Sequence, residues 1–180
     1  MNIKIEKLEQ PTASIVEVMN RWENDGQLIP LVRRNRNEEE LNKREQVTIE
    51  KVKQRLEKQH VYLIYLEDQL VGEINYAVDP HYLYKHEQGS VMLGITIGES
   101  EARGKGVGYQ AIRQIENEVR RHGLKRVELG VFAFNKHARK LYKKLGYEEI
   151  GFIDNFTFWQ GEMWRDIRME KYINRNGSIC

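Results

Sequence analysis

The sequence predicts an α/β domain of the α+β type, with a mixed, mostly antiparallel central sheet of about seven strands and helices on both faces. Strand-like segments lie before, between and after the helical ones. Three of them follow one another directly, which is typical of antiparallel pairing. We find no internal repeat, low-complexity block or convincing linker. We therefore expect one domain over residues 1–172 and a polar C-terminal tail over residues 173–180.

The first third of the chain predicts a strand and two helices. Residues 2–8, "NIKIEKL", alternate between apolar and polar, as in a half-buried strand. Apolar residues at helical spacing predict a helix over about Thr12–Trp22, which the turn "ENDGQLIP" follows. The heavily charged segment from Glu38 to Gln59 carries apolar residues about one turn apart, so we predict one amphipathic helix there.

The middle of the chain predicts an antiparallel set of three strands and then a long helix. The strand segments are "VYLIYLED", "QLVGEINYAVD" and "SVMLGITIG", and the short connection "EDQ" between the first two suits a hairpin. Beyond Gly104, apolar residues on one helical face predict a helix that begins near Val107 and stops at Gly123.

The last third predicts three strands and a short helix. The segment "RVELGVFAF" has strand composition. Asn135 is a good N-cap residue and Gly146 a good C-terminal stop, so they bound a helix. Two closing strands are expected around Tyr147–Phe152 and Trp164–Tyr172.

Composition favours a cytoplasmic protein that binds neither nucleic acid nor membrane. The 29 basic and 27 acidic residues leave a net charge of only +2, which argues against a broad surface for nucleic acid. The longest apolar run is far too short to span a bilayer, and the charged N-terminus lacks a signal-peptide core. Cys180 is the single cysteine, which excludes an internal disulfide or cysteine metal cluster. The histidines have no zinc-protease spacing, so we expect no metal.

The glycine-rich stretch "RGKGVG", residues 103–108, forms a corner between a strand and a helix. Free amides at a helix N-terminus bind anions, and glycines allow a phosphate to approach the backbone closely. The spacing does not match a P-loop, because Gly106 follows Lys105, nor a dinucleotide loop, because its third glycine position holds Tyr109. A tight turn without a ligand is the alternative.

This stretch resembles the R/Q-x-x-G-x-G/A pyrophosphate loop of the GNAT superfamily of acetyl-CoA-dependent N-acetyltransferases. A second motif, "NKHARKLYKKLGY" at residues 135–147, resembles the family pattern N-x-x-A-x-x-L-Y-x-x-x-G-F/Y. Order, spacing and the intervening strand all agree. The closing "WRDIRMEKY" looks like the last strand of the branch with ribosomal-protein N-terminal and spermidine acetyltransferases. The resemblance covers roughly residues 61–172.

The resemblance implies a cosubstrate, acetyl-CoA, held where the segments "LGITI" and "VELGVFAF" splay apart. Its pantetheine arm would pair with the strand near Ile95 and Ile97, and Asn135 would orient the distal end of that arm. Ala138 and Tyr142 would line the same site. The pyrophosphate would lie on the amides of Arg103, Gly104, Lys105, Gly106, Val107 and Gly108.

Tyr142 is, by resemblance, the general acid that protonates the departing thiolate, because a phenol can hydrogen-bond to the developing charge and donate its proton. A purely structural role, in which the ring packs under the sheet, is the alternative. The attacking amine must also lose a proton. Glu73 and Glu128 lie on expected central strands, and either could be that base, unless each points to solvent.

The leading hypothesis is therefore an N-acetyltransferase that moves an acetyl group to a primary amine by direct attack in a ternary complex. The acceptor stays open between a small-molecule amine, such as a polyamine or an aminoglycoside, and a peptide N-terminus. A CoA-binding regulatory module without turnover is the alternative from another class. A monomer or homodimer is expected.

Overall fold

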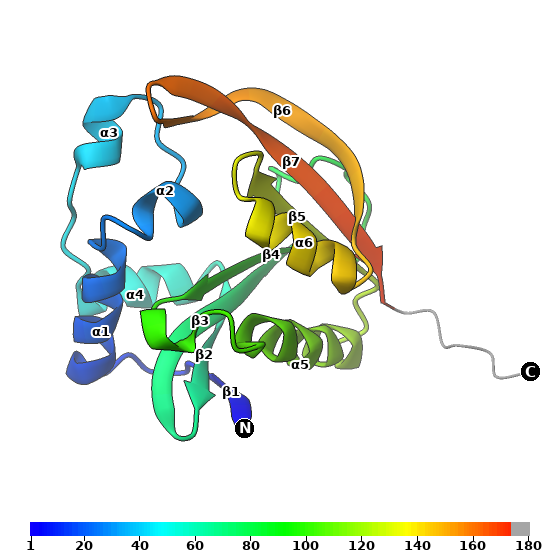
Figure 1. Cartoon of the computed structure of the whole chain (residues 1–180). Helices are drawn as coiled ribbons and strands as arrows, with labels where there is room; N and C mark the ends of the chain where they lie inside the picture. Colours follow the sequence, from blue (N-terminus) through cyan, green and yellow to red (C-terminus); the bar gives the residue numbers. More distant parts are fainter. Residues whose placement is uncertain (174–180) are drawn as a thin grey trace, which may run out of the picture.

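The computed structural model describes residues 1–173 and is built on a seven-stranded sheet in the order β1-β2-β3-β4-β5-β7-β6 (Figure 1). All neighbouring strands are antiparallel except β4 and β5, which are parallel. The mixed, mostly antiparallel sheet predicted from the sequence is confirmed. The predicted tail with Cys180 lies outside the described residues, apart from Ile173. The strands are β1 (Ile3–Lys7), β2 (His60–Leu66), β3 (Gln69–Val78), β4 (Ser90–Ile97), β5 (Arg126–Phe132), β6 (Glu148–Trp159) and β7 (Glu162–Tyr172).

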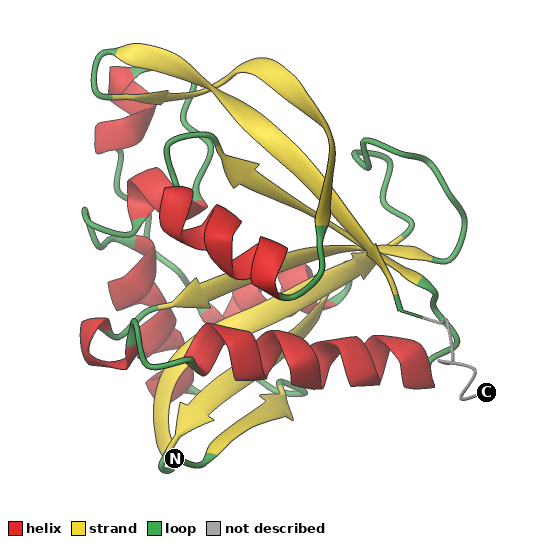
Figure 2. Cartoon of the chain, turned by 45° about the vertical axis from the view of Figure 1, so that its right-hand side comes forward, coloured by secondary structure: helices red, strands yellow, loops and turns green. Residues whose placement is uncertain are grey.

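Helices cover both faces of this sheet (Figure 2). Among the described residues, six helices are α-helices and one short segment, η1, is a 3-10 helix. None of the helices within residues 1–173 is long and apolar enough to cross a bilayer. The helices are α1 (Ala13–Glu23), α2 (Ile29–Val32), α3 (Glu38–Asn42), α4 (Ile49–Leu56), η1 (Ser100–Ala102), α5 (Val107–Arg121) and α6 (Lys136–Lys144).

The sheet is split between its two parallel strands. β4 and β5 pair only at Ser90–Arg126, Val91–Val127 and Met92–Glu128. Beyond these pairs β4 stays with β3 and β5 stays with β7, so the two halves of the sheet diverge. Figures 1 and 2 show the strands separating toward the side where α1 to α4 lie. The predicted splay of these strands is confirmed, and it opens a cleft in the middle of the sheet.

One face of the sheet is covered by α5 and α6. Ile112, Ile115 and Val119 lie on the apolar side of α5 and are almost fully buried against the strands. Tyr142 and Leu145 bring α6 into the same cluster of buried side chains. Burial of this apolar face is the main force that holds α5 on the sheet. It also sets the N-terminus of α5 at the mouth of the split.

The opposite face is covered by α1 and α4. Met19 and Val52 from these helices pack with Leu63 of β2 in a second buried cluster. The end of α1 is held by Trp22, whose ring lies so close to Gly98 that any side chain there would collide with it. The Trp22 indole nitrogen donates a 2.9 Å hydrogen bond to Glu99. These contacts fix the C-terminal end of α1 beside the end of β4.

The single amphipathic helix predicted over residues 38–59 is wrong: the chain forms α3 and α4 with an extended connection between them. The break follows from two side-chain caps. Thr48 accepts a hydrogen bond from the amide of Lys51 and so begins a new helix. Arg33 donates to the carbonyl oxygens of Glu40 and Lys43, which satisfies the end of α3.

Two further features differ from the sequence predictions. The four-residue helix α2 lies where only a turn was expected, and it begins with Pro30 in its first turn. β6 extends to Trp159, well past the predicted end at Phe152. Its far end pairs with the segment after α2: the amide of Phe158 donates to the carbonyl of Asn35 at 2.7 Å. This pairing partner is 123 positions away in sequence, so local patterning does not reveal it.

Candidate functional site

The split between β4 and β5 opens into a cleft of about 1460 Å³. It runs from the N-terminus of α5 and the facing side of α6 to α1, α2 and α4. A volume of this size is larger than most small-ligand pockets, which occupy roughly 300–1,000 Å³. The cleft can therefore hold one long ligand together with a second, smaller one.

The glycine corner forms one end of this cleft. Gly104 and Gly106 have φ values of +72° and +78°, a conformation that glycine adopts without strain. No atom lies within 4 Å of the position that a Cβ would take at either residue, so the backbone is open to a ligand. Gly106 is the N-cap of α5. The first backbone N–H groups of a helix carry a partial positive charge and point outward from its N-terminus. The corner fits a phosphate group.

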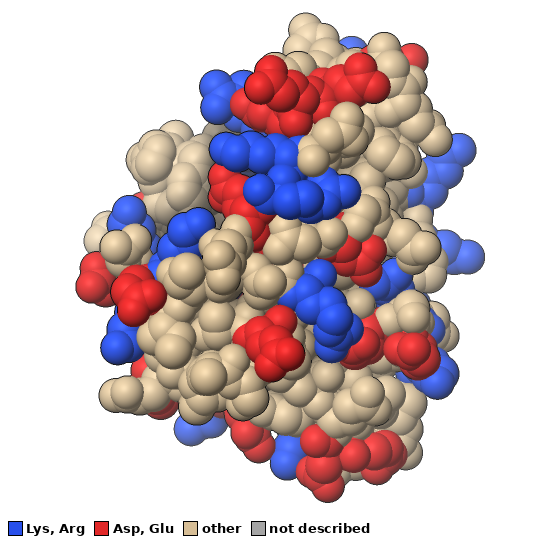
Figure 3. All heavy atoms as spheres, turned by 90° about the vertical axis from the view of Figure 1, so that its left-hand side faces the viewer, with Lys and Arg blue, Asp and Glu red and all other residues tan. Residues whose placement is uncertain are grey.

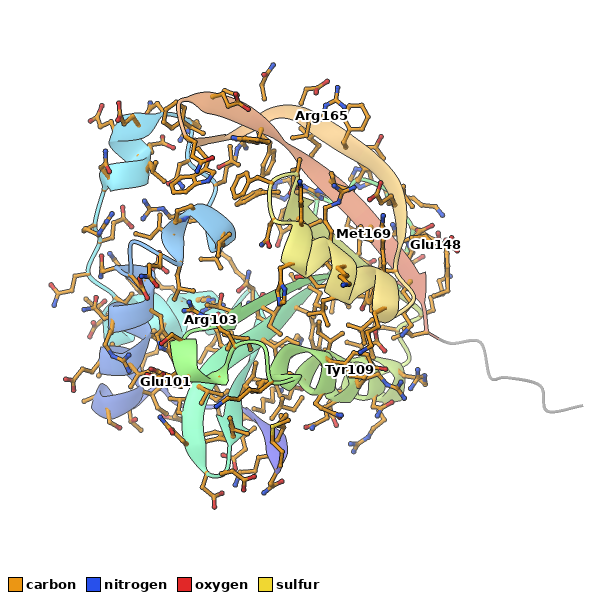
Figure 4. The ribbon with its side chains drawn as sticks, in the orientation of Figure 1. Glu101, Arg103, Tyr109, Glu148, Arg165 and Met169 are labelled. Carbon is orange, nitrogen blue, oxygen red and sulfur yellow. The ribbon has the colours of Figure 1, made fainter. Side chains whose placement is uncertain are left out.

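Arg103 supports this corner from behind. Its guanidinium donates to the carbonyl oxygens of Ile97 and Gly98 at 3.1 and 3.0 Å. It thereby ties the loop to the end of β4, as well as placing positive charge at the rim. Figure 4 labels Arg103 next to η1 and Tyr109 at the start of α5. The ammonium group of Lys144 on α6 lies 5.3 Å from the Tyr109 ring centre and adds a second basic group to the same rim.

The wall contributed by α6 presents Asn135, Ala138 and Tyr142 to the cleft. The Asn135 side chain accepts a hydrogen bond from the amide of Ala138 at 3.2 Å, so it caps α6. Ala138 and Tyr142 are four residues apart and share one face of the helix. Gly108 suits the close approach of α6 to α5, because a Cβ there would lie 3.3 Å from the Leu141 side chain, a tight contact.

Tyr142 is 8% exposed, and burial raises the pKa of its phenol to about 12. Within residues 1–173 its hydroxyl makes no hydrogen bond. A buried tyrosine hydroxyl usually has a partner. The Tyr142 hydroxyl is therefore available to a ligand in the cleft, and it remains protonated at neutral pH.

Ile95 and Ile97 lie on the part of β4 that has separated from β5, and both line the cleft. On its other side this part of β4 is fully paired with β3. The edge that faces the cleft can therefore pair with an extended ligand, as an added strand would.

Glu73, one of the two predicted base residues, lies on β3 and lines the cleft. Its carboxylate is bound by both terminal nitrogens of Arg55, at 2.5 and 2.9 Å. Arg55 in turn donates to Gln59 from its remaining nitrogen. The structure thus brings Glu73 to the site, in a bidentate ion pair that reaches from β3 to α4.

Glu128, the other predicted base residue, is not in the cleft. Its side chain is fully buried and accepts hydrogen bonds from Arg126, Arg168 and the amides of Tyr84 and Lys85. Burial alone would raise its pKa, but these hydrogen bonds outweigh burial and lower the pKa of the carboxylate. It neither points to solvent nor reaches a substrate, and instead anchors the loop between β3 and β4.

Several residues that line the cleft were not singled out from the sequence. Asp166 of β7 is buried, is paired with Arg168 at 2.8 Å, and lies against Gly130. The signal that selected Glu73, a carboxylate on a central strand, would also have selected Asp166. Leu31 and Val32 of α2 line the cleft although they are 41% and 44% exposed. The apolar run "LIPLV" was the available signal for them.

Charges outside the cleft are mixed. On the face drawn in Figure 3, acidic and basic side chains alternate, and neither sign covers the surface. Arg165 lies on the outer side of the β6–β7 hairpin (Figure 4), with its guanidinium 4.0 Å from the Phe152 ring centre.

Within the described part of the chain, no group of three or more His, Cys, Asp or Glu residues is arranged to hold a metal ion.

Comparison with known proteins finds one family and several relatives. The model of the acetyltransferase (GNAT) family matches residues 19–147. A spermine/spermidine N(1)-acetyltransferase from Bacillus subtilis (strain 168) is 30% identical over 92 residues, which are 51% of this chain and 60% of that protein. The chain thus spans less than two thirds of the length of this curated relative.

Solved structures share the fold over nearly the whole chain. A spermidine N-acetyltransferase from Vibrio cholerae, in complex with CoA and spermine, has a TM-score of 0.73 at 14% identity and covers 95% of each chain. A ribosomal-protein-alanine N-acetyltransferase from Brucella melitensis has a TM-score of 0.72 at 22% identity, over 96% of this chain and 99% of that one. At these identities the likeness is one of fold.

Proposed function

Since this chain belongs to the acetyltransferase (GNAT) family, we propose that it is an acetyl-CoA-dependent N-acetyltransferase that acetylates a primary amine by direct attack. The observation that carries the proposal is the cleft itself. It joins an open glycine corner at a helix N-terminus to a tyrosine hydroxyl without a partner among the described residues. The solved structure of the acetyltransferase yncA from Salmonella typhimurium, which has a similar fold with a TM-score of 0.70, contains acetyl-CoA.

The glycine corner is the proposed site of the CoA pyrophosphate. Backbone amides between Arg103 and Gly108 would donate to its oxygens, and the dipole of α5 favours its charge. The free edge of β4 at Ile95 and Ile97 would pair with the pantetheine arm. Asn135 and Ala138 at the start of α6 would lie along the same arm.

Acetyl-CoA supplies a thioester whose carbonyl carbon accepts the amine nitrogen while its sulfur leaves as a thiolate. Tyr142 is the proposed general acid, because its phenol is protonated at neutral pH and can donate to that sulfur. The raised pKa of Tyr142 makes it a weak acid in isolation. Its contribution therefore rests on a hydrogen bond that strengthens as negative charge develops on the sulfur.

Proton removal from the amine is proposed for Glu73, because Glu128 is sealed away from the cleft. Both oxygens of Glu73 already accept hydrogen bonds from Arg55, which weakens the carboxylate as a direct base. Transfer through a water molecule that contacts Glu73 is consistent with this geometry. The relatives named for spermine and spermidine make polyamines the first acceptors to compare.

The proposal is tested first by calorimetric titration with acetyl-CoA, which requires no knowledge of the acceptor. We expect saturable binding that CoA competes away. Gly106→Asp should abolish binding, because it puts a carboxylate where the pyrophosphate lies. The matched control is Gly123→Asp at the other end of α5, where φ is +77° and no atom lies within 4 Å of the Cβ position.

The pair of variants separates charge at the site from backbone strain, because both substitutions place an aspartate at a left-handed glycine. Retained binding in Gly106→Asp would mean that the anion site lies elsewhere. Binding of acetyl-CoA without transfer to any amine would support a regulatory module in place of an enzyme.

A further inference from the structure

The end of the cleft formed by α1, α2 and α4 contains a carboxylate without a partner. Within residues 1–173 the Glu23 side chain, at the end of α1, makes no hydrogen bond or ion pair. The other acidic residues that line the cleft are each held by a cation: Glu73 by Arg55, Asp166 by Arg168 and Glu45 by Lys43. Glu23 is thus the one carboxylate here, among the described residues, that is free to bind an ammonium group.

Positive charge along the cleft is in excess. Arg33, Arg34 and Lys51 line it and form no ion pair with any carboxylate of the described chain. They are held by uncharged acceptors: Arg34 donates to the carbonyl of Phe156, and Lys51 donates to the carbonyl of Gln46. An acceptor with several positive charges would meet one free carboxylate and three cations. The cleft therefore disfavours a polycation.

The surroundings of Glu23 are consistent with this role. Glu23 remains exposed to solvent, but its partial burial raises the pKa of its carboxyl group, and the negative charges of Glu73 and Glu45 add to that rise. Arg33 and Arg55 lower its pKa, but both are already bound to other groups. A carboxylate in this state is stabilised when a cation arrives.

Apolar side chains of α2 line the same cleft as Glu23. Leu31 and Val32 of α2 line it while remaining exposed, and Arg33, the residue that follows them, acts on Glu23 electrostatically. Exposed apolar side chains inside a cleft favour an apolar ligand, because burial releases their hydration water. The α2 surface is therefore suited to the carbon skeleton of an acceptor.

We propose that the acceptor is a primary amine with a single positive charge and an apolar body. Glu23 attracts the ammonium group, whose nitrogen then gives its proton to a water molecule at Glu73 and attacks the thioester, while the apolar body lies on Leu31 and Val32. The inference rests on the proposed N-acetyltransferase function and names its substrate class. Glu23 is a positioning residue that brings the reacting amine toward Glu73, and it is distinct from the proposed acid Tyr142 and from the glycine corner.

The first experiment compares acceptors for the full chain at saturating acetyl-CoA. Hexylamine and phenethylamine are the apolar monoamines, and spermidine and putrescine are the polyamines. We expect kcat/KM for hexylamine to exceed that for spermidine by about tenfold or more, and to rise about threefold per methylene from ethylamine upward. A preference for spermidine would overturn this inference while leaving the proposed function intact. Failure of these amines with acetyl-CoA bound would overturn this inference, and failure of an aminoglycoside and a peptide N-terminus as well would overturn the proposed function.

The second experiment changes the two parts of the acceptor site. Glu23→Gln should raise KM for hexylamine about tenfold while calorimetric affinity for acetyl-CoA stays unchanged. The control is Glu17→Gln, an exposed residue of the same helix that lies outside the cleft. Val32→Ser should raise KM for hexylamine and leave ethylamine unaffected, and Val78→Ser is its control, with 43% exposure against 44% for Val32. Equal effects in variant and control would overturn the assignment.

Discussion

The sequence motif identifies Tyr142, but only the structure shows the environment of its hydroxyl group. Its phenol is buried, has no partner among residues 1–173, and keeps its proton because burial raises its pKa to about 12. We expect Tyr142→Phe to lower turnover about 100-fold, a usual size for loss of a general acid. Acetyl-CoA affinity should stay nearly unchanged, because the ring is retained. Steady-state kinetics and calorimetry on the same preparation measure both.

The turnover of the Phe variant separates this role from a simple packing role, and the pH profile of the wild type checks the raised pKa of Tyr142. Because the pKa of Tyr142 lies well above neutrality, the wild-type rate should show no loss from its ionisation between pH 6 and 9. Turnover of the Phe variant that equals the wild type would assign Tyr142 to packing alone.

The residues for which a motif specifies both identity and spacing lie together in the structure. Gly106, Asn135 and Tyr142 all line the cleft, because a left-handed cap, a helix cap and a helix face each have a local signature. The two carboxylates have no such signature. Whether Glu128 reaches the cleft depends on Arg168 of β7 and on the amides of a distant loop, which alternation along one strand cannot reveal.

At the scale of elements, a buried ion network joins β5, β7 and the loop between β3 and β4. Glu128 bridges Arg126 and Arg168, and its oxygens also hold that loop through the amide of Tyr84. Glu128→Ala would remove one of two carboxylates from each of two buried guanidinium groups, since Arg126 keeps Glu170 and Arg168 keeps Asp166. It would also leave the amides of Tyr84 and Lys85 without their acceptor. We expect a loss of about 3–5 kcal/mol in the free energy of unfolding, measured by denaturant titration.

The matched control is the exposed ion pair between Asp154 and Arg165 on β6 and β7. Asp154→Ala should change the free energy of unfolding by about 0.5 kcal/mol or less, because water already screens that pair. Similar losses in the two variants would show that Glu128 contributes no more than a surface carboxylate.

Element types were predictable and element boundaries were less so. The long helix α5 and the three-strand set β2 to β4 have strong periodic patterns, and the structure confirms them. The segment 38–59 has helical spacing throughout, yet Thr48 begins a second helix and Arg33 ends the first. Two side-chain caps, Thr48 within the segment and Arg33 outside it, thus override the periodicity of the segment.

For the whole molecule, paired carboxylates predict a loss of stability in acid. Glu99, bound by Arg21, and Glu128 have pKa values lowered below the unfolded value of 4.5. Their contribution is therefore fully present above that value and is lost as the pH falls through the lower pKa of the folded state. We expect the free energy of unfolding to fall between pH 6 and pH 3.

A substitution can test this assignment. Glu99→Gln should make the dependence on pH shallower over that range, because one linked proton is lost. Glu38→Gln serves as the control, since Glu38 is exposed and forms no ion pair within residues 1–173. An unchanged slope in Glu99→Gln would contradict the linkage.

The split between β4 and β5 also bears on how the chain avoids aggregation. An unpaired strand edge normally invites pairing with a second chain. In this fold the free edge of β4 beyond Met92 faces a cleft walled by α6 and by α1, so it points into the molecule. A narrow flexible ligand can reach that edge, whereas the strand of another folded chain is too broad. The cleft that admits a ligand thus also keeps the unpaired edge of β4 from pairing with strands of neighbouring molecules.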